Sequence, residues 1–169
     1  TVTEQRVPPA EDRLRAVCPA CGYVDYVNPI AVVGTVPVWR GEAVLLCRRA
    51  IEPRHGLWTL PAGFLELGET LAEGAARETR EEAGAPIELG GVYSLLDVLH
   101  VGQIHVFFRA TLTSRDLDPG PETLEARIFP FAEIPWDELA FRTVHRTLEH
   151  LVDDAQAGVT DALHTGTIS

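Results

Sequence analysis

Alternation between apolar and polar residues along the chain predicts a series of short strands and two helices. Apolar runs separated by turn-like polar segments predict strands at residues 30–38, 43–47, 90–98, 103–113 and 125–131. The first two runs flank the polar turn Arg40-Gly41-Glu42 and therefore predict a β-hairpin. Apolar side chains at helical spacing, Val144, Leu148 and Leu151 among them, predict an amphipathic helix over 141–154.

The second helix is predicted over 71–83, between the two pairs of strands. Thr70 is a suitable N-cap and Glu73 follows three residues later, which is the capping-box pattern. Gly84 and Pro86 supply the stop signal at the other end. Small and apolar residues form one stripe along this helix, which we expect to lie against a sheet: Leu71, Ala72, Ala75, Ala76, Thr79 and Ala83.

Three glutamates share a second face of this helix, beside the packing stripe. Glu78, Glu81 and Glu82 stand at positions i, i+3 and i+4. Neighbouring like charges at this spacing cost a helix ~0.2–0.5 kcal/mol per pair. A hard divalent cation such as Mg²⁺, which prefers oxygen ligands, would remove that repulsion. The other interpretation is an acidic face exposed to solvent.

Glycine and charged residues before and within this helix follow one spaced pattern. It begins with the lead-in Trp58-Thr59-Leu60-Pro61 and continues through Gly63, Glu69, Arg77-Glu78, Glu81-Glu82 and Gly84, separated by five, seven, two and one residues. This spacing resembles the Nudix box, and every charged and glycine position of that motif is filled. Thr79 is the one departure, because the family usually has an aliphatic residue there. The likeness covers most of the chain.

The resemblance implies a fold and an activity. The expected fold is an α/β/α sandwich with a mixed sheet, in which the box forms a loop-helix-loop motif that binds metal. Nudix enzymes use Mg²⁺ or Mn²⁺ to cleave a nucleoside diphosphate linked to another moiety into a nucleoside monophosphate and a phosphorylated product. Bound cations neutralise the diphosphate and make a water molecule acidic enough to attack phosphorus near neutral pH.

The resemblance also implies roles for individual residues. Glu78, Glu81 and Glu82 are the expected metal ligands, together with the main-chain carbonyl of Ala62. Arg77 and Glu69 are expected to orient these ligands. Either Glu82 or Glu81 could accept the proton of the attacking water, and the sequence does not distinguish between them.

A fourth carboxylate is expected from outside the box, because three glutamates on one helix approach a metal cluster from one side only. Asp97, Glu122 and Glu125 are the candidates. We predict Glu125, since it precedes the apolar Ile128-Phe129 segment and resembles the acidic residue that supplies a distal ligand in related Nudix enzymes. The other interpretation of Glu125 is an exposed loop residue.

Aromatic and glycine residues of the box region have structural interpretations as well. We interpret Trp58 and Phe64 as packing residues rather than as a surface for base stacking. Gly63 and Gly68 could serve tight turns, although a backbone that approaches phosphate oxygens also favours glycine. These alternatives differ in what lies around each residue.

The cysteines suggest a metal site of a different kind. Cys18-Pro19-Ala20-Cys21, followed by the segment 26–29, resembles the second knuckle of the zinc ribbon that precedes the catalytic domain in one Nudix subgroup. Structural zinc takes four ligands, and two are present here. Because the sequence contains no methionine, we expect the other pair to precede Thr1. A redox-active pair is the alternative, and Cys47 is interpreted as a core residue of a strand.

Length and charge limit the remaining possibilities. The chain has 169 residues and a formal net charge of −11, so we expect it to repel duplex nucleic acid and anionic membranes. No apolar run is long enough to span a membrane, and we expect a cytoplasmic protein.

The predicted organisation is an arm with half of a zinc ribbon over 1–29, a Nudix domain over 30–156 and a tail over 157–169. A homodimer is expected because it is the commonest symmetric assembly.

Substrate choice depends on the subgroup. The chain lacks the SQPWPFPxS array of the NADH-cleaving branch and resembles zinc-ribbon Nudix proteins that include FAD pyrophosphatases. The expected partner is therefore a small nucleotide conjugate such as FAD, ADP-ribose or a related ADP conjugate. Two alternatives stay open: a module that senses a nucleotide without cleaving it, and an mRNA-decapping enzyme.

Overall fold

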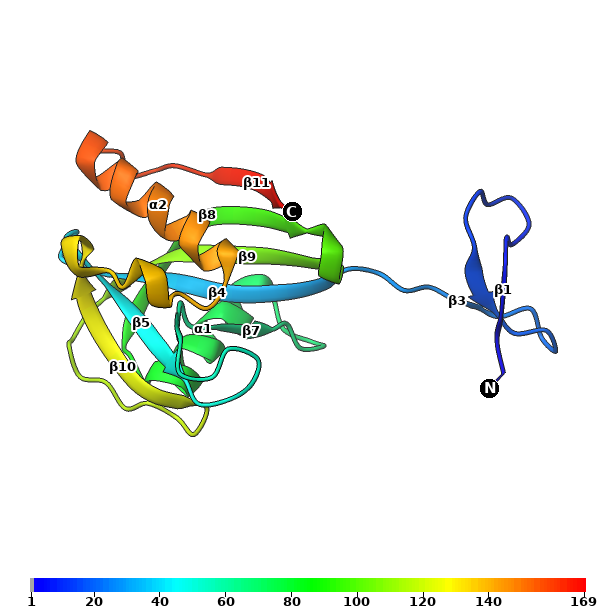
Figure 1. Ribbon diagram of the computed structural model, residues 1–169, viewed down its shortest axis with the longest axis horizontal. Coiled ribbons are helices and arrows are strands. Elements are labelled where there is room, and N and C mark those ends of the chain that lie inside the picture. The colour runs from blue at the N-terminus through cyan, green and yellow to red at the C-terminus, as the bar shows by residue number, and fades with distance from the viewer. Residues whose placement is uncertain (1) are drawn as a thin grey trace.

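The structure is a computed structural model that describes residues 2–169. Its strands form two separate sheets. The smaller sheet is antiparallel and consists of β1 (Glu4–Arg6), β2 (Arg15–Val17) and β3 (Val24–Asp25). Figure 1 shows this small sheet set apart from the rest of the molecule and joined to it by an extended segment. The segment expected as an arm therefore contains a small β-module of its own.

The larger sheet has eight strands and is mixed, as expected. Its order is β10-β5-β4-β9-β8-β11, with β6 added to β5 and β7 added to β4. The strands are β4 (Ile30–Trp39), β5 (Ala43–Arg49), β6 (Trp58–Thr59), β7 (Ala62–Phe64), β8 (Ile87–Val98), β9 (Gln103–Leu112), β10 (Thr123–Pro130) and β11 (His164–Ile168). The β4/β9 and β8/β11 pairs are parallel and the other pairs are antiparallel.

Two helices cover opposite faces of the larger sheet (Figure 1). They are α1 (Leu71–Ala83) and α2 (Arg142–Ala157), and three short 3₁₀ helices lie in the connections: η1 (Leu99–Val101), η2 (Phe131–Glu133) and η3 (Trp136–Glu138). Ala75 of α1 packs in one core cluster with Phe108, whereas Leu148 of α2 packs in another with Phe107. Successive residues of a strand point to opposite faces, so the predicted α/β/α sandwich is confirmed.

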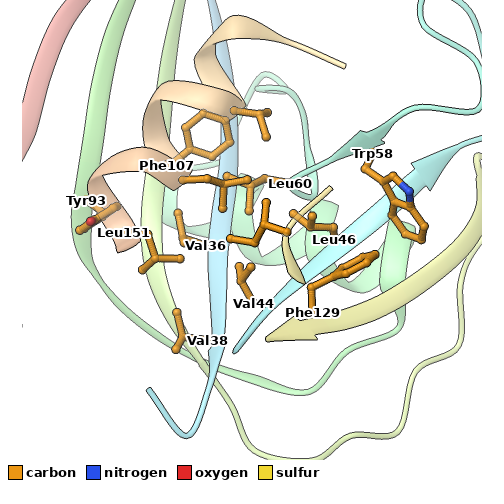
Figure 2. Close-up of a cluster of buried hydrophobic side chains, with 13 residues drawn as sticks. Val36, Val38, Val44, Leu46, Trp58, Leu60, Tyr93, Phe107, Phe129 and Leu151 are labelled. Carbon is orange, nitrogen blue, oxygen red and sulfur yellow. The ribbon is translucent and has the colours of Figure 1, made fainter. Parts of the chain in front are cut away.

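The largest core cluster lies between α2 and the sheet (Figure 2). Trp58 is 4% exposed and meets the ring of Phe129 edge-on, with ring centroids 4.9 Å apart. Full burial of one large apolar side chain stabilises a fold by roughly 1.5–3 kcal/mol. The cluster therefore fixes the segment that leads from β6 into the box.

Local sequence signals predicted the box helix with its observed bounds. The Oγ1 atom of Thr70 accepts a hydrogen bond from the N–H of Glu73 (3.2 Å), and the Glu73 carboxylate accepts one from the N–H of Thr70 (2.8 Å). Gly84 ends the helix in the left-handed conformation at φ 58°. Thr79, the departure from the family pattern, is fully buried and its hydroxyl bonds to that of Thr35 at 2.6 Å.

The C-terminal segment contains a strand that the sequence did not suggest. The tail expected over 157–169 includes β11, which pairs in parallel with β8 along the edge of the sheet. His164 anchors this strand, because its Nε2 atom lies 2.8 Å from Asp154 of α2. Among residues 2–169, no helix combines the length and the apolar composition that crossing a membrane would require.

Candidate active site

One glutamate from the loop before α1 and two glutamates of the helix surround the arginine at position 77. Arg77 makes a two-pronged ion pair with Glu69, with distances of 3.0 Å from Nε and 2.7 Å from Nη2. Its Nη1 atom also donates to Glu78 at 2.6 Å and to Glu81 at 3.2 Å. Arg77 further donates to the main-chain carbonyl of Phe64 at 3.1 Å. The guanidinium therefore ties the loop before α1 to two of the helix carboxylates.

Glu69 is held as a carboxylate by this pairing. The adjacent Arg77 and the N–H of Glu66, which donates to Glu69 at 2.8 Å, lower the pKa of Glu69 to about 2. The hydrogen bonds to Glu69 and Glu78 raise the pKa of Arg77 above its usual value. Both side chains are therefore charged across the whole range in which an enzyme works, and they form a fixed support beside Glu78 and Glu81.

Gly63 leaves the space in which the carboxyl group of Glu78 lies. A Cβ atom on Gly63 would stand 2.4 Å from the carboxyl carbon of Glu78, so no other residue fits there without displacing it. Gly68 is different, because it adopts φ 90° and nothing lies within 4 Å of its Cβ position. The turn explanation therefore holds for Gly68, and close approach explains Gly63.

Glu82 lies beneath the segment that precedes Gly63. The N–H of Ala62 donates to the Glu82 carboxylate at 3.1 Å. Burial raises the pKa of Glu82 to about 8, and the neighbouring charge of Glu78 adds to this increase. Burial also raises the pKa of Glu78. Two poorly solvated carboxyl groups therefore lie one helical turn apart. Ionising both costs free energy, and a bound cation would reduce that cost.

These residues fit a divalent metal by the chemistry of their donor atoms. Glutamate oxygens and a main-chain carbonyl are the hard ligands that Mg²⁺ and Mn²⁺ prefer. Among residues 2–169, no three His, Cys, Asp or Glu side chains already converge as a complete metal site. Glu78 and Glu81 are instead turned toward the Arg77 guanidinium.

Glu125, the predicted fourth carboxylate, pairs with a neighbouring arginine rather than with a residue around Arg77. Glu125 pairs with Arg127 on the same strand, with 2.8 Å between Nε of Arg127 and Oε1 of Glu125. The negative charge of Glu122, by contrast, contributes to the raised pKa of both Glu78 and Glu82. The role of Glu125 as a distal ligand stays a prediction.

Phe64 corrects one interpretation made from the sequence. Its side chain is 58% exposed, so it is not a packing residue, whereas Trp58 packs in the core as expected. Phe64 is the last residue of β7, at the edge of the sheet beside the box. Cys47 is buried as expected, and burial raises the pKa of its thiol well above the usual value.

The two remaining cysteines lie on the turn between β2 and β3. The N–H of Gly22 donates to the carbonyl of Cys18 at 2.9 Å, and the N–H of Cys18 donates to the carbonyl of Tyr23 at 2.8 Å. Main-chain N–H groups of Cys21 and Ala20 bond to the Cys18 thiol and lower its pKa. A turn that favours a thiolate fits a zinc knuckle. The two cysteines would supply two of the four ligands that structural zinc takes.

Two protein-family models match different parts of the chain. Residues 29–151 match the NUDIX domain, and residues 1–27 match the Nudix N-terminal zinc ribbon. A NUDIX hydrolase from Nitrosomonas europaea has a crystal structure that is 44% identical in sequence, with a TM-score of 0.92 over 98% of this chain and 93% of that one.

Two curated relatives share about a third of their aligned residues with this chain. ADP-ribose pyrophosphatase of Methanocaldococcus jannaschii is 33% identical over 120 residues, which are 69% of each protein. NAD-capped RNA hydrolase NudC of Photobacterium profundum is 33% identical over 131 residues, which are 75% of this chain. The match spans about half of that relative, 47% of its length. From the filled box, its position on α1 and these matches, the chain belongs to the Nudix family of pyrophosphohydrolases.

Proposed function

We propose that this protein is a divalent-metal-dependent hydrolase that cleaves the diphosphate of ADP conjugates, with ADP-ribose as the leading substrate. The observation that carries the proposal is the pair of desolvated carboxyls, Glu78 and Glu82, beside the space left by Gly63. Two charged carboxylates in such a position are unfavourable without a cation, and a bound divalent cation would reduce that cost.

Glu78, Glu81, Glu82 and the carbonyl of Ala62 would hold the metal. When bound there, Mg²⁺ or Mn²⁺ supplies charge neutralisation at the diphosphate and lowers the pKa of the attacking water. Arg77, paired with Glu69, keeps Glu78 and Glu81 oriented. Arg77 thus holds Glu78 and Glu81 in defined positions before substrate arrives.

The reaction needs one proton acceptor in the protein. Water adds to one phosphorus of the diphosphate, and the bond from that phosphorus to the bridging oxygen breaks. The proton of the water passes to a carboxylate, either Glu82 or Glu81, and the bridging oxygen leaves on the second phosphate. Glu82 is the better-defined candidate in position, because the N–H of Ala62 holds one of its oxygens at 3.1 Å.

The choice of ADP-ribose follows from the named relatives. The M. jannaschii relative is an ADP-ribose pyrophosphatase and aligns over 69% of both chains. FAD and related ADP conjugates are further candidates from the subgroup that the sequence resembles. A small molecule is also consistent with a net charge of −11, which opposes binding of a long polyanion.

Product analysis with a substrate panel tests this proposal. The purified protein is incubated with ADP-ribose, FAD and NAD, each with Mg²⁺, with Mn²⁺ or with a chelator, and the products are separated by chromatography. We expect AMP and ribose 5-phosphate from ADP-ribose with either metal and neither product with the chelator. Tight binding of ADP-ribose without any cleavage would instead support a nucleotide-sensing module.

Removal of an NAD cap from RNA is the second candidate function. It is favoured by the match to NudC, which covers three quarters of this chain. Comparing kcat/KM for NAD and for an NAD-capped oligonucleotide distinguishes the two functions. A preference for the free dinucleotide is expected from the acidic charge, and a clear preference for the capped RNA would assign the decapping activity.

A further inference from the structure

Two buried threonines join the box helix to an interior strand of the larger sheet. Thr79 of α1 and Thr35 of β4 are both fully buried, and their hydroxyl oxygens lie 2.6 Å apart. The Nudix box usually has an aliphatic residue at position 79. An aliphatic side chain would fill the same space without a buried polar group, so the hydroxyls add a directed hydrogen bond to this contact.

The direction of this hydrogen bond follows from the number of protons. The hydroxyl of Thr79 donates to the main-chain carbonyl of Ala75, one turn earlier in α1, at 2.9 Å. A hydroxyl group has one proton to donate, so Thr35 is the donor and Thr79 the acceptor in the bond between them. The result is a chain of two hydrogen bonds from β4 into the main chain of α1. Such chains strengthen their members in a low-dielectric interior.

Thr35 also holds the segment on the other side of the site, through its main chain. Its N–H donates to the carbonyl of Pro61 at 3.1 Å. Pro61 precedes Ala62, whose carbonyl is an expected metal ligand and whose N–H donates to Glu82 at 3.1 Å. Gly34 permits this close approach, because a Cβ atom there would stand 2.5 Å from the carbonyl oxygen of Pro61. One residue of β4 thus contacts both segments that carry the expected ligands.

These contacts close into a ring that passes through an expected ligand and returns along α1. Its members are Thr35, Pro61, Ala62, Glu82 and Thr79. The helix cannot slide or rotate against the segment before Gly63 without breaking one of the bonds in the ring. Groups that bind a metal have to be held to within about 0.5 Å by the residues that support them. The bond between the two hydroxyls is in a position to do this.

We propose that Thr35 and Thr79 are positioning residues of the metal site, and that the bond between their hydroxyls sets the distance from the carboxylates of α1 to the carbonyl of Ala62. The inference rests on the proposed function, which assigns the metal to these ligands. Because both side chains are fully buried, they act through the elements that they join.

The opposite face of the sheet supplies a matched control. Ser94 of β8 and Thr147 of α2 are also fully buried, and their hydroxyl oxygens lie 2.9 Å apart. α2 covers the face of the sheet opposite α1 (Figure 1) and carries none of the expected ligands. Removal of a hydroxyl from either pair should lower stability, whereas only removal from the first pair should change metal binding.

Mn²⁺ binding by the substrate-free protein tests the proposal without turnover. Mn²⁺ is titrated into the wild type, Thr79→Val, Thr79→Ser and Thr147→Val under conditions in which circular dichroism shows folded protein, and free Mn²⁺ is measured by electron paramagnetic resonance. We expect Thr79→Val to bind Mn²⁺ at least about tenfold more weakly, as for other residues that orient metal ligands. Thr147→Val, and Thr79→Ser with its retained hydroxyl, should bind it like the wild type.

Urea unfolding without metal separates positioning from a purely structural role. Thr79→Val and Thr147→Val should lower the unfolding midpoint similarly, because each leaves the hydroxyl of its strand partner buried without a partner. Thr79→Ser should lower the midpoint too, because loss of a buried methyl group leaves a cavity, yet keep its Mn²⁺ affinity. Mn²⁺ affinity that follows stability across the three variants, or that is unchanged in Thr79→Val, overturns the proposal.

Thr35→Val removes the same bond from the side of the strand. It leaves Thr79 bonded to Ala75 and keeps a β-branched residue on β4, so it is the milder change and decides the question if Thr79→Val does not fold. We expect the same weakening of Mn²⁺ binding, and a rise in the Mg²⁺ concentration for half-maximal rate that exceeds any fall in kcat at saturating Mg²⁺. Wild-type Mn²⁺ affinity in Thr35→Val overturns the proposal.

The wild type separates the two ways of failing. If it cleaves none of the ADP conjugates, the proposed function fails, and Mn²⁺ binding still decides whether the two threonines position the carboxylates. If it cleaves them and Thr79→Val binds Mn²⁺ as tightly as the wild type, only the positioning role is overturned. A wild type that binds no Mn²⁺ overturns the metal site and the positioning role together.

Discussion

Individual residues of the box show why a sequence pattern and a functional geometry are different things. The pattern predicted which residues gather on α1, but not that Glu82 lies under Ala62 in a poorly solvated position. Nor did it distinguish Gly63, which makes room for Glu78, from Gly68, which serves a turn. These properties depend on segments that meet only in the folded chain.

Glu82 should make the stability of the metal-free protein depend on pH. Its pKa is raised from 4.5 to about 8, so the folded state gives up this proton less readily than the unfolded state. The resulting stabilisation is fully present below pH 4.5 and is lost as the pH rises through 8. Glu82→Gln should therefore stabilise the metal-free protein by roughly 3 kcal/mol at pH 8.5 and by little at pH 4.5. Denaturant unfolding at both pH values measures this difference, and an equal effect at both would contradict it.

Gly63→Ala should impair activity more than stability. The added Cβ would stand 2.4 Å from the carboxyl carbon of Glu78 and force that side chain aside. We expect turnover to fall at least about tenfold, as for other small misplacements at active sites. Gly91→Ala is the control, because nothing lies within 4 Å of its Cβ position. Comparable turnover in the two variants would show that Glu78 does not need this position.

Among the elements, those specified by local signals were predictable and those that depend on distant partners were not. The box helix has the bounds predicted from its capping box and from Gly84. The short strands β6 and β7 have two and three residues, too few to show a hydrophobic period. β11 is held by its pairing with β8 and by the contact of His164 with Asp154, and its own sequence carries little apolar signal.

The elements that face α1 should supply the fourth carboxylate. We predict that Glu125→Gln, at the start of β10, lowers turnover and raises the Mg²⁺ concentration needed for half-maximal rate. Glu122→Gln is the matched comparison, because the charge of Glu122 acts on Glu78 and Glu82 in the structure. Rates measured across a Mg²⁺ titration rank the two variants, and a larger effect of Glu122→Gln would transfer the role to that residue.

At the scale of the whole molecule, the chain combines a Nudix domain with a small β-module that carries two cysteines. The sequence predicted this combination from the spacing of Cys18 and Cys21, and the match of residues 1–27 to the zinc ribbon supports it. How the module is placed could not be predicted, because the extended segment that leads into β4 has no pattern of its own (Figure 1).

Zinc should bind weakly to the 169-residue chain. Cys18 and Cys21 supply half of a tetrahedral site, and binding free energy falls steeply with missing ligands. We expect well under one zinc per chain after dialysis, measured by elemental analysis, with Cys18→Ser as the control for residual binding. Stoichiometric zinc that survives dialysis would show that other residues complete the site.

The most direct test of the central claim is the metal-dependent turnover of ADP-ribose by two variants of the box. Glu78→Gln and Glu82→Gln remove the charge of the proposed ligands while relieving repulsion between neighbouring carboxylates, so both should stay folded. With saturating Mg²⁺, we predict that each variant loses most of the AMP-forming activity, whereas Glu88→Gln, at an exposed position on β8, keeps it. Near-normal turnover in both box variants, with melting curves that show folded protein, would contradict the account.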